Sequence, residues 1–302
     1  MSLHLPTTRQ LQYFLALEEH EHFGRAAEAS NVSQSAFSVA IQELEAALNV
    51  QLVDRTSRQV TITSVGREIA DQARLCLRDL GDLVEIARGR QGPLTGPLRL
   101  GIIPTIAPFV LPRLMPAIRK RFAGLRPFLT EDLTLNLHQQ LMDGGLDLIL
   151  IALPYELRNV ETEVLFRDRF RLAARADTRL VDPGKFRLNR LNAESVLLLR
   201  DGHCLRDHAI DACRLRSADS INRFAATSLL TLIEMVDADL GVTFLPEMAE
   251  GSAMLKATKV RTWPLSDKNY REIALAWRRG SARADDFRAL GDLITSLHQR
   301  SG

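Results

Sequence analysis

Cysteine is scarce in this sequence, with three in 302 residues, and so small and odd a number excludes a structural disulfide framework. Long apolar runs are also lacking. The longest, residues 146–153, is interrupted by Asp147 and is far too short to span a bilayer. No basic segment with a cleavage site opens the chain, so we expect no secretory signal. These absences predict a cytoplasmic protein without a membrane partner, in which a bonded cysteine pair would act as a switch.

Lysine is absent from the first 92 residues, which contain nine arginines and twelve acidic residues and therefore have a net charge of −3. The whole chain is nearly neutral, with a formal charge of +2. DNA-binding domains usually carry a basic excess, because phosphate contacts supply much of their affinity. Charge therefore argues weakly against DNA binding by this segment, and its local motifs have to decide.

Residues 1–63 predict three short helices followed by a β-hairpin. Apolar periodicity indicates helices over residues 8–20 and 23–30, and Ser33 is a good N-cap for a third. Residues 52–63 predict the hairpin. The exposed face of the third helix includes Gln34, Ser35 and Ser38, and the hairpin tip carries Arg55, Ser57 and Arg58. Such side chains suit base edges and phosphates. The alternative is a small helical bundle used only for association, since polar helix faces are usually just solvated.

Residues 64–90 predict a long helix with an apolar seam. Its members recur at steps of three and four: Val65, Ile69, Ala73, Cys76, Leu80, Leu83 and Ala87. This spacing is close to a heptad pattern, and heptad seams pair helices. We expect the helix to form a dimer and Cys76 to be a buried packing residue of the seam. Residues 89–96, rich in glycine, then end the helix and supply a hinge.

Residues 91–302 predict an α/β domain. Strands are expected at 98–103, 146–152, 171–174, 196–199 and 273–277, and they alternate with helical stretches such as 107–122. This alternation is typical of layered α/β folds with parallel strands. Ligands in such folds bind beyond the carboxyl ends of strands, which makes Thr105 a candidate cleft residue.

Residues 201–213 hold the other two cysteines. Cys204 follows Gly202 and His203 and lies near the first turn of an expected helix, where the helix dipole favours a thiolate. Arg206 and His203 are candidates for adding positive potential. Cys213 is nine residues further on, about 13 Å away if the helix is unbroken. A disulfide needs Cα atoms within about 7 Å, so joining the two would require a change of conformation.

Several motifs of the first 66 residues resemble the LysR-type transcriptional regulators. They are Phe23-Gly-Arg-Ala-Ala27, Val32-Ser-Gln34, the Leu44/Leu48 spacing, and Leu52-Val-Asp-Arg55 followed by Thr63 and Gly66. The resemblance implies a winged helix-turn-helix domain over 1–63, a dimerising linker helix over 64–90 and a regulatory domain over 91–302. The regulatory domain is expected to have two lobes, as periplasmic binding proteins do, and the chain is expected to cross between the lobes near residues 165 and 265. One departure is Ser35, where the family commonly has proline; serine still permits a helix at this position.

The regulatory domain resembles the hydrogen-peroxide-sensing branch of that family. The matching segments are Gly101-Ile-Ile-Pro-Thr105, Gly202-His-Cys-Leu-Arg-Asp207, Ala226-Thr-Ser-Leu229 and Gly241-Val-Thr-Phe-Leu-Pro246, with the nine-residue cysteine spacing. The resemblance implies a peroxide-reactive Cys204 that forms sulfenic acid, and a resolving Cys213 that forms a disulfide with it. Thr105, Thr134, His203 and Asp207 are the candidates for peroxide binding and proton relay. Thr130 competes with Thr134, and Ala225 replaces an expected arginine.

The same resemblance predicts the partners. They are promoter DNA, hydrogen peroxide, further copies of the chain as a dimer and then a tetramer, and RNA polymerase, for a regulator that activates oxidative-stress genes. No cofactor and no metal are expected. Three alternatives remain: a LysR-type regulator that answers a small organic effector and has structural cysteines, a metal sensor, and a peroxide-consuming enzyme. His203, Cys204, His208 and Cys213 match no common zinc spacing, and an enzyme would leave the DNA-binding half unexplained.

Overall fold

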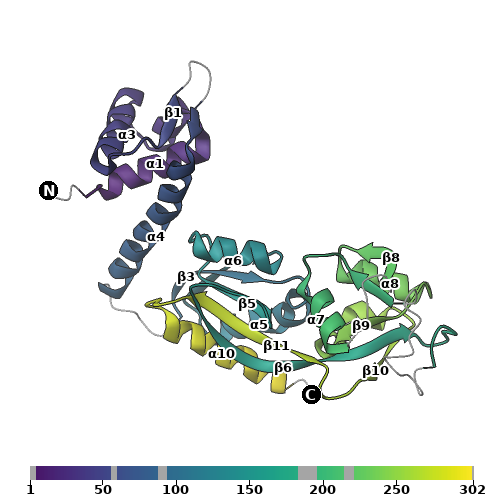
Figure 1. Ribbon diagram of the computed structural model, residues 1–302. Coiled ribbons are helices and arrows are strands. Elements are labelled where there is room, and N and C mark those ends of the chain that lie inside the picture. Colours follow the sequence, from purple (N-terminus) through teal and green to yellow (C-terminus); the bar gives the residue numbers. More distant parts are fainter. Residues whose placement is uncertain (1–4, 56–59, 88–93, 183–195, 214–220, 301–302) are drawn as a thin grey trace. The chain divides into compact units, whose positions relative to one another are not determined.

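The computed structural model describes residues 5–55, 60–87, 94–182, 196–213 and 221–300 (Figure 1). The chain divides into two compact units, Met1–Arg90 and Gln91–Gly302. The predicted hinge falls partly on residues 88–93, and the hairpin tip on residues 56–59, so both lie outside the described residues. None of the described helices is long and apolar enough to cross a membrane.

The first unit contains the predicted helices and hairpin. Its elements are α1 (Thr8–His20), α2 (Phe23–Ala29), α3 (Gln34–Leu48), β1 (Val53–Arg55), β2 (Val60–Ile62) and α4 (Ser64–Ala87). The hydroxyl of Ser33 accepts a hydrogen bond from the Ala36 amide at 3.3 Å, so this serine caps α3 as expected. Phe14, Phe37 and Leu44 are fully buried where the three helices meet, which makes the helix faces predicted from periodicity the core of this unit.

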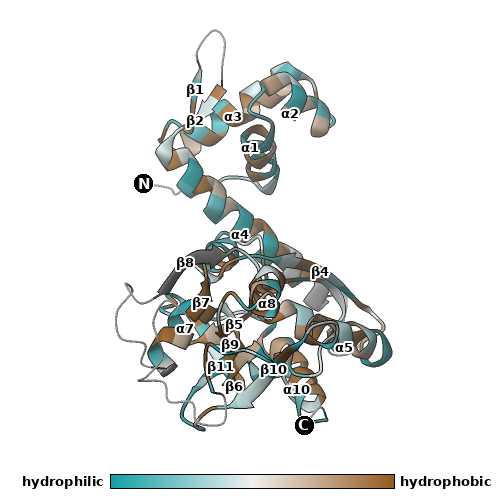
Figure 2. Ribbon diagram, turned by 90° about the vertical axis from the view of Figure 1, so that its right-hand side faces the viewer, coloured by the Kyte–Doolittle hydropathy of each residue, from teal (hydrophilic) through white to brown (hydrophobic). Residues whose placement is uncertain are grey.

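The helix α4 has 24 residues and carries both hydrophilic and hydrophobic side chains along its length (Figure 2). Ala70 and Ala73 are buried against the rest of the first unit. Further along, Leu80 is 42% exposed and Leu83 is 60% exposed. Cys76, which we expected to be buried in a helix pair, is exposed on the single chain.

The second unit is built on a seven-stranded sheet with the order β10-β6-β11-β5-β3-β4, to which β9 adds by pairing with β6. These strands are β3 (Gly96–Ile102), β4 (Leu125–Glu131), β5 (Leu148–Leu153), β6 (Val160–Arg175), β9 (Thr243–Pro246), β10 (Val260–Pro264) and β11 (Tyr270–Arg278). A separate parallel pair joins β7 (Val196–Leu199) and β8 (Ile221–Ala226). The helices are α5 (Ala107–Arg121), α6 (Thr134–Met142), α7 (Cys204–Cys213), α8 (Leu229–Asp237), α9 (Ala253–Lys256) and α10 (Ala284–Gln299), with the 3₁₀ helix η4 (Glu247–Ala249).

The expectation of a parallel sheet is wrong for most of these pairings. In the large sheet β3 runs parallel to β4 and β5, whereas β11 is antiparallel to both β5 and β6, and β9 and β10 are antiparallel to β6. Three of these antiparallel pairings involve the 16-residue strand β6, which pairs with β11 over its first part and with β9 and β10 over its last part (Figure 1). Its first part is mostly half-buried and has mixed polar and apolar side chains, so the apolar pattern predicted only the more buried end, residues 171–174.

Two hydrophobic cores lie within this unit. One surrounds β3, β5 and β11 and includes α5 and α10, and the other surrounds the last part of β6, β7, β9 and α8. The chain passes from the first core to the second along β6, between Phe166 and Phe170, and returns between β10 and β11. Cys204 belongs to the first core and the next residue, Leu205, to the second, so α7 begins where the two cores meet.

Candidate functional site

Cys204 is the first residue of α7, as the sequence predicts, and its side chain is only 6% exposed. The helix continues unbroken to Cys213. Nine residues of helix separate the two cysteines by about 13 Å along the axis. The side chain of Cys213 lies outside the described part of the structure.

Thr105 and Thr134 are both buried at the edge of the first core. Thr105 follows β3 and is 2% exposed, and Thr134 begins α6 and is 1% exposed. The Thr134 hydroxyl is near enough to Cys204 to lower the pKa of its thiol, and it forms no hydrogen bond of normal geometry with any described residue. Thr130, the alternative to Thr134, is half-buried on β4. Of the two threonines, Thr134 is the one that affects the pKa of Cys204.

A buried arginine that the sequence analysis missed organises this site. The guanidinium of Arg271, on β11, donates to the Thr105 hydroxyl at 2.9 Å and to the Thr105 carbonyl at 3.0 Å. Its Nε donates to a carboxylate oxygen of Asp168, on β6, at 2.9 Å, and both side chains are fully buried. Asp168 also accepts a hydrogen bond from the Met248 amide at 3.1 Å. Burial raises the pKa of Asp168, while the charge of Arg271 and this amide act to lower it.

One signal for Arg271 was present in the sequence. The residues at positions 267–272 are mostly charged or polar, which indicates an exposed loop. Arg271 nevertheless lies an even number of residues from Ile273, Leu275 and Trp277 along β11, and these three side chains are buried. Alternation along a strand sends residues of one parity to one face, so extending the predicted strand by two residues would have placed Arg271 in the core.

The charge that faces Cys204 comes from Arg271 rather than from the residues expected. Burial raises the pKa of the Cys204 thiol, and Asp207 raises it further, while Arg271 and the Thr134 hydroxyl lower it. Arg206, which was expected to stabilise the thiolate, instead pairs with Asp201 at 2.8 Å and Asp207 at 3.5 Å. Because burial outweighs the favourable groups, the resting side chain is the protonated thiol at neutral pH.

His203 and Asp207 lie at the rim of the site. The ring of His203 is half-buried and bonds to the backbone of Thr227, and burial lowers its pKa, so the ring is neutral at neutral pH. Asp207 is exposed. Among the described residues, neither is hydrogen-bonded to Cys204. The structure therefore links Cys204 to Thr134 and Arg271, and Arg271 to Thr105, while Asp207 acts on Cys204 only through its charge.

The raised pKa of Cys204 predicts a steep pH dependence of its reactivity. Below the pKa of a thiol, each pH unit multiplies the reactive thiolate fraction by about ten. The rate of Cys204 alkylation by iodoacetamide should therefore rise about tenfold per unit between about pH 6 and pH 8. Mass spectrometry of the Cys204 peptide, with Cys76→Ser and Cys213→Ser introduced, measures this rate alone. A flat profile would mean that the thiol is already ionised.

The first unit presents a second candidate site on α3. Gln34 and Ser35 are exposed and Ser38 is half-exposed, all in the first two turns of the helix. Ser35 lies within α3, so the missing proline does not interrupt it. Arg55 ends β1, and nothing is described of its side chain, while Ser57 and Arg58 fall in residues 56–59 outside the described part.

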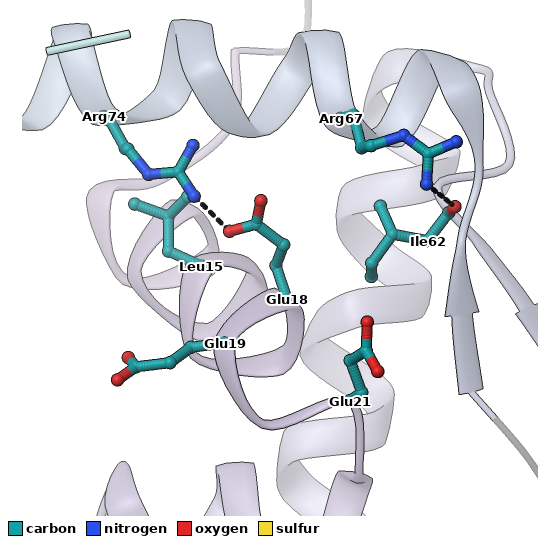
Figure 3. Close-up of a pocket in the computed structure, with 7 residues that line it drawn as sticks. All are labelled: Leu15, Glu18, Glu19, Glu21, Ile62, Arg67 and Arg74. Atoms are coloured by element: carbon teal, nitrogen blue, oxygen red, sulfur yellow. Dashed lines mark hydrogen bonds and ion pairs between the residues drawn. The ribbon is translucent and has the colours of Figure 1, made fainter. Parts of the chain in front are cut away.

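Two other arginines of the first unit form contacts with residues of the same unit. Arg67 and Arg74 line a pocket beside α1 together with Glu18, Glu19 and Glu21 (Figure 3). Arg67 donates to the Ile62 carbonyl at 3.0 Å, and Arg74 pairs with Glu18 and, at 2.7 Å, with Asp71. Arg74 is thus paired with two carboxylates, whereas Arg67 is exposed and makes this bond through a single guanidinium nitrogen.

Two family models cover the chain. Residues 8–67 match the bacterial regulatory helix-turn-helix protein of the lysR family, and residues 91–299 match the LysR substrate binding domain. The chain belongs to the LysR family of transcriptional regulators. It therefore has an N-terminal helix-turn-helix domain and a mixed α/β regulatory domain, and its relatives are regulators of transcription rather than enzymes.

Individual relatives of this LysR-type regulator match over nearly the whole chain. A protein of Haemophilus influenzae named hydrogen peroxide-inducible genes activator is 38% identical over 290 residues, which is 95% of each chain. The structure of a full-length OxyR variant from Pseudomonas aeruginosa superposes with a TM-score of 0.77 at 32% identity, covering 96% of this chain and 98% of that one. A mutant OxyR from Corynebacterium glutamicum with hydrogen peroxide bound gives a TM-score of 0.66 at 32% identity, covering 99% and 94%.

Proposed function

We propose that this LysR-type regulator senses hydrogen peroxide through Cys204 and activates genes of the oxidative-stress response. The observation that carries the proposal is the buried thiol of Cys204, on which the buried Thr134 and Arg271 act, with Arg271 also bonded to the buried hydroxyl of Thr105. The similarity to a peroxide-inducible activator and to a peroxide-bound OxyR supports the same conclusion.

The proposed reaction starts from the Cys204 thiolate, formed when the thiol loses its proton. The sulfur attacks one oxygen of hydrogen peroxide, so that an S–O bond forms while the O–O bond breaks. The sulfur is oxidised to sulfenic acid, and the other oxygen leaves as hydroxide and becomes water on taking a proton. The positive charge of Arg271 favours both the thiolate and the departing hydroxide, because charge stabilisation is strong in a dry site.

The two threonines are proposed to hold the peroxide. Thr105 is fixed by two bonds from Arg271, and a hydroxyl that accepts from a guanidinium keeps its own proton free to donate to an oxygen of the substrate. The Thr134 hydroxyl is buried without a partner of normal geometry among the described residues, so it too is available to donate. His203 and Asp207 are proposed to pass the proton between this cluster and solvent.

The second proposed step joins Cys204 to Cys213. The Cys213 sulfur attacks the sulfenic sulfur, a disulfide forms, and the sulfenic oxygen leaves as water. Since α7 holds these residues about 13 Å apart and a disulfide needs about 7 Å, the helix must unwind. Unwinding of α7, which packs on β7 and β11, is the proposed signal to the rest of the regulator.

Thiol counting and peptide mapping after one equivalent of peroxide test the proposed function. We expect two thiols to be lost, both to return on reduction, and mass spectrometry to find the Cys204 and Cys213 peptides joined. Loss of no thiol would contradict peroxide sensing and would favour a regulator that answers a small organic effector.

Promoter DNA is the proposed partner of the first unit, with Gln34, Ser35 and Ser38 in the major groove and Arg55, Ser57 and Arg58 on the backbone. The regulator is accordingly proposed to act in the cytoplasm of a bacterium, where promoter DNA is found. Arg55→Ala should weaken binding to all sequences and reduce the slope of log affinity against log salt by about 1, because one phosphate contact is lost. Gln34→Ala should instead change sequence preference. Titrations of specific and unrelated duplexes at several salt concentrations distinguish the two effects, and a purely sequence-dependent effect of Arg55→Ala would contradict the assignment of the wing.

The linker helix α4 is proposed to hold two chains together as a dimer. Two dimers are proposed to form a tetramer through their regulatory domains, which are two-lobed and similar to periplasmic binding proteins. The tetramer is proposed to contact RNA polymerase. The exposed apolar side chains of Leu80 and Leu83 support the dimer, since a partner helix would bury them.

Leu80→Glu should give monomers or aggregates in analytical ultracentrifugation, because it puts a charge on the seam. Gln72→Glu, on an exposed residue of the same helix, is the control and should leave the assembly intact. An unchanged oligomer with Leu80→Glu would remove the seam from the interface.

A further inference from the structure

His208 lies on α7 one turn after Cys204 and has no part in the chemistry proposed for peroxide. Residues four apart in a helix lie on the same face, so the ring projects from the side of α7 that carries the Cys204 sulfur. The side chain of His208 is only 6% exposed. Buried polar groups are nearly always hydrogen-bonded, so the partner of this ring indicates its role.

One hydrogen bond ties the ring of His208 to a different part of the fold. Its Nε2 lies 2.8 Å from the carbonyl oxygen of Pro154, the residue that follows β5. A carbonyl oxygen only accepts hydrogen bonds, so Nε2 carries a proton and donates it. The other ring nitrogen, Nδ1, is buried and has no partner among the described residues. The bond therefore fastens α7 to the end of β5, which lies between β11 and β3 in the large sheet.

Arg206, another polar side chain of α7, forms contacts of a more local kind. Its guanidinium pairs with Asp201 at 2.8 Å and with Asp207 at 3.5 Å. Asp207 is on α7 itself, and Asp201 is three residues before the helix begins, so these pairs do not attach α7 to the sheet. Leu205 packs in the second core. The bond of His208 therefore adds an attachment on the side of the first core, to which β5 belongs.

We propose that His208 is a positioning residue that holds α7 in its helical form and thereby sets the rate at which Cys204 and Cys213 form a disulfide. This inference rests on the proposed function, in which α7 unwinds after Cys204 has become sulfenic acid. His208 lies between the two cysteines along the helix, so unwinding carries its ring away from Pro154 and breaks their bond. The bond therefore slows the second step of the reaction.

The first step does not depend on this bond. Nε2 of His208 is occupied by Pro154, and Nδ1 has no partner among the described residues, so within them the ring forms no hydrogen bond to Cys204, Thr105 or Thr134. A residue that served only the stability of the site would alter both steps. Separate measurement of the two steps therefore distinguishes positioning of α7 from a general contribution to the fold.

Acid should weaken the hold of His208, because the buried ring resists a second proton. Burial lowers the pKa of His208 from its ordinary value of 6.5 and the charge of Arg271 also lowers it, while the bond to Pro154 and the charges of Asp207 and Asp211 act to raise it. The pocket beside the ring is also lined by titratable groups from other segments: Tyr155, Glu156, Lys268, Tyr270 and Glu272.

The sign of the pH effect follows from where the proton binds better. Unwinding of α7 releases the ring to water, where its pKa returns toward 6.5, so the unwound form binds the proton more tightly than the helical form. Between the lowered pKa and 6.5, each unit by which the pH falls favours the unwound form by up to about tenfold. The second step should gain by the same factor.

Rapid mixing with excess peroxide tests the proposal when sulfenic acid and disulfide are quantified separately in a Cys76→Ser background. His208→Phe keeps a buried ring that cannot donate, so we expect disulfide formation to be about three- to tenfold faster, the range for one neutral hydrogen bond, with sulfenic acid formed at an unchanged rate. His208→Gln, whose amide can donate to the same carbonyl, should restore the slow second step. Arg206→Gln is the matched control on α7 and should change the second step less than about twofold.

The same two variants at acid pH test the ring itself. The rate of disulfide formation in the unaltered chain, divided by the rate in His208→Gln, should rise by up to about tenfold from pH 7.5 to pH 5.5, because glutamine does not titrate. The ratio removes the effect of Cys213 ionisation, which the two proteins share. A ratio that is the same at both pH values would contradict the release of the ring to water.

Three results of the rapid-mixing experiment would overturn the proposal: an unchanged second step in His208→Phe, an equal change of both steps, or a His208→Gln protein that behaves like His208→Phe. If the unaltered chain loses no thiol to peroxide, the proposed function fails instead. Amide hydrogen exchange of α7 in the reduced proteins then tests the hold of His208 alone. Exchange should be faster by about three- to tenfold in His208→Phe and unchanged in His208→Gln, and equal exchange in all three proteins would overturn the proposal.

Discussion

Replacement of Cys204 by serine should abolish the peroxide response of the regulator. A serine hydroxyl does not ionise near neutral pH and cannot form a sulfenic acid, so the S–O bond of the first step cannot form. The two side chains are similar in size, and Cys204 is a buried member of the first core, so the fold should survive. Transcription from a target promoter in vitro, with and without peroxide, measures the effect, and we expect complete loss of induction with DNA binding retained.

The other two cysteines provide the controls for this experiment. Cys213→Ser should still allow oxidation of Cys204 but should trap it as sulfenic acid or as a mixed disulfide with a small thiol. Cys76→Ser should leave the response intact, because Cys76 is in the other unit, on α4. A response that survives Cys204→Ser and is lost with Cys76→Ser would move the sensor to the linker helix and contradict the proposed function.

Replacement of Arg271 by glutamine should both destabilise the second unit and suppress the reaction of Cys204 with peroxide. The change leaves Asp168 buried without its cation, and removing one partner of a buried pair costs about 3–5 kcal/mol. It also releases Thr105 and removes the guanidinium whose charge does most to lower the pKa of Cys204. Urea unfolding measures the first effect, and stopped-flow oxidation measures the second.

Two further variants separate stability from reactivity. The double change Arg271→Met with Asp168→Leu removes both charges, and apolar replacements of buried pairs are often neutral or stabilising, so it should recover much of the free energy of unfolding. It should remain unreactive, because the charge is still missing. Arg167→Gln is the surface control, since this arginine is 65% exposed and pairs with Glu272 at 3.5 Å; we expect a loss below about 1 kcal/mol. Normal peroxide reactivity in the double variant would show that Arg271 serves only the fold.

The sequence by itself determined the helices of the first unit and the start of α7. The bounds of α1 match the prediction, and α3 begins directly after its predicted cap Ser33. These features are predictable because their signals are local: apolar residues recur at the helical period, and a cap satisfies amides only three residues away. Cys204 at the beginning of α7 follows from the same local reasoning.

Tertiary structure decided the direction of the strands and the charge at the site. The edge strand β4 is largely exposed and the first part of β6 is mostly half-buried, so neither has an apolar run to reveal it. The antiparallel pairing of β6 with β11 remained hidden for this reason. Arg271 bonds to Asp168, 103 residues away, and to Thr105, 166 residues away. Local sequence marks such an arginine as exposed, because a charge is buried only when distant partners satisfy it. The cysteines could be located from sequence, but the burial that raises the pKa of Cys204 and the buried Arg271 charge that lowers it were set by tertiary packing.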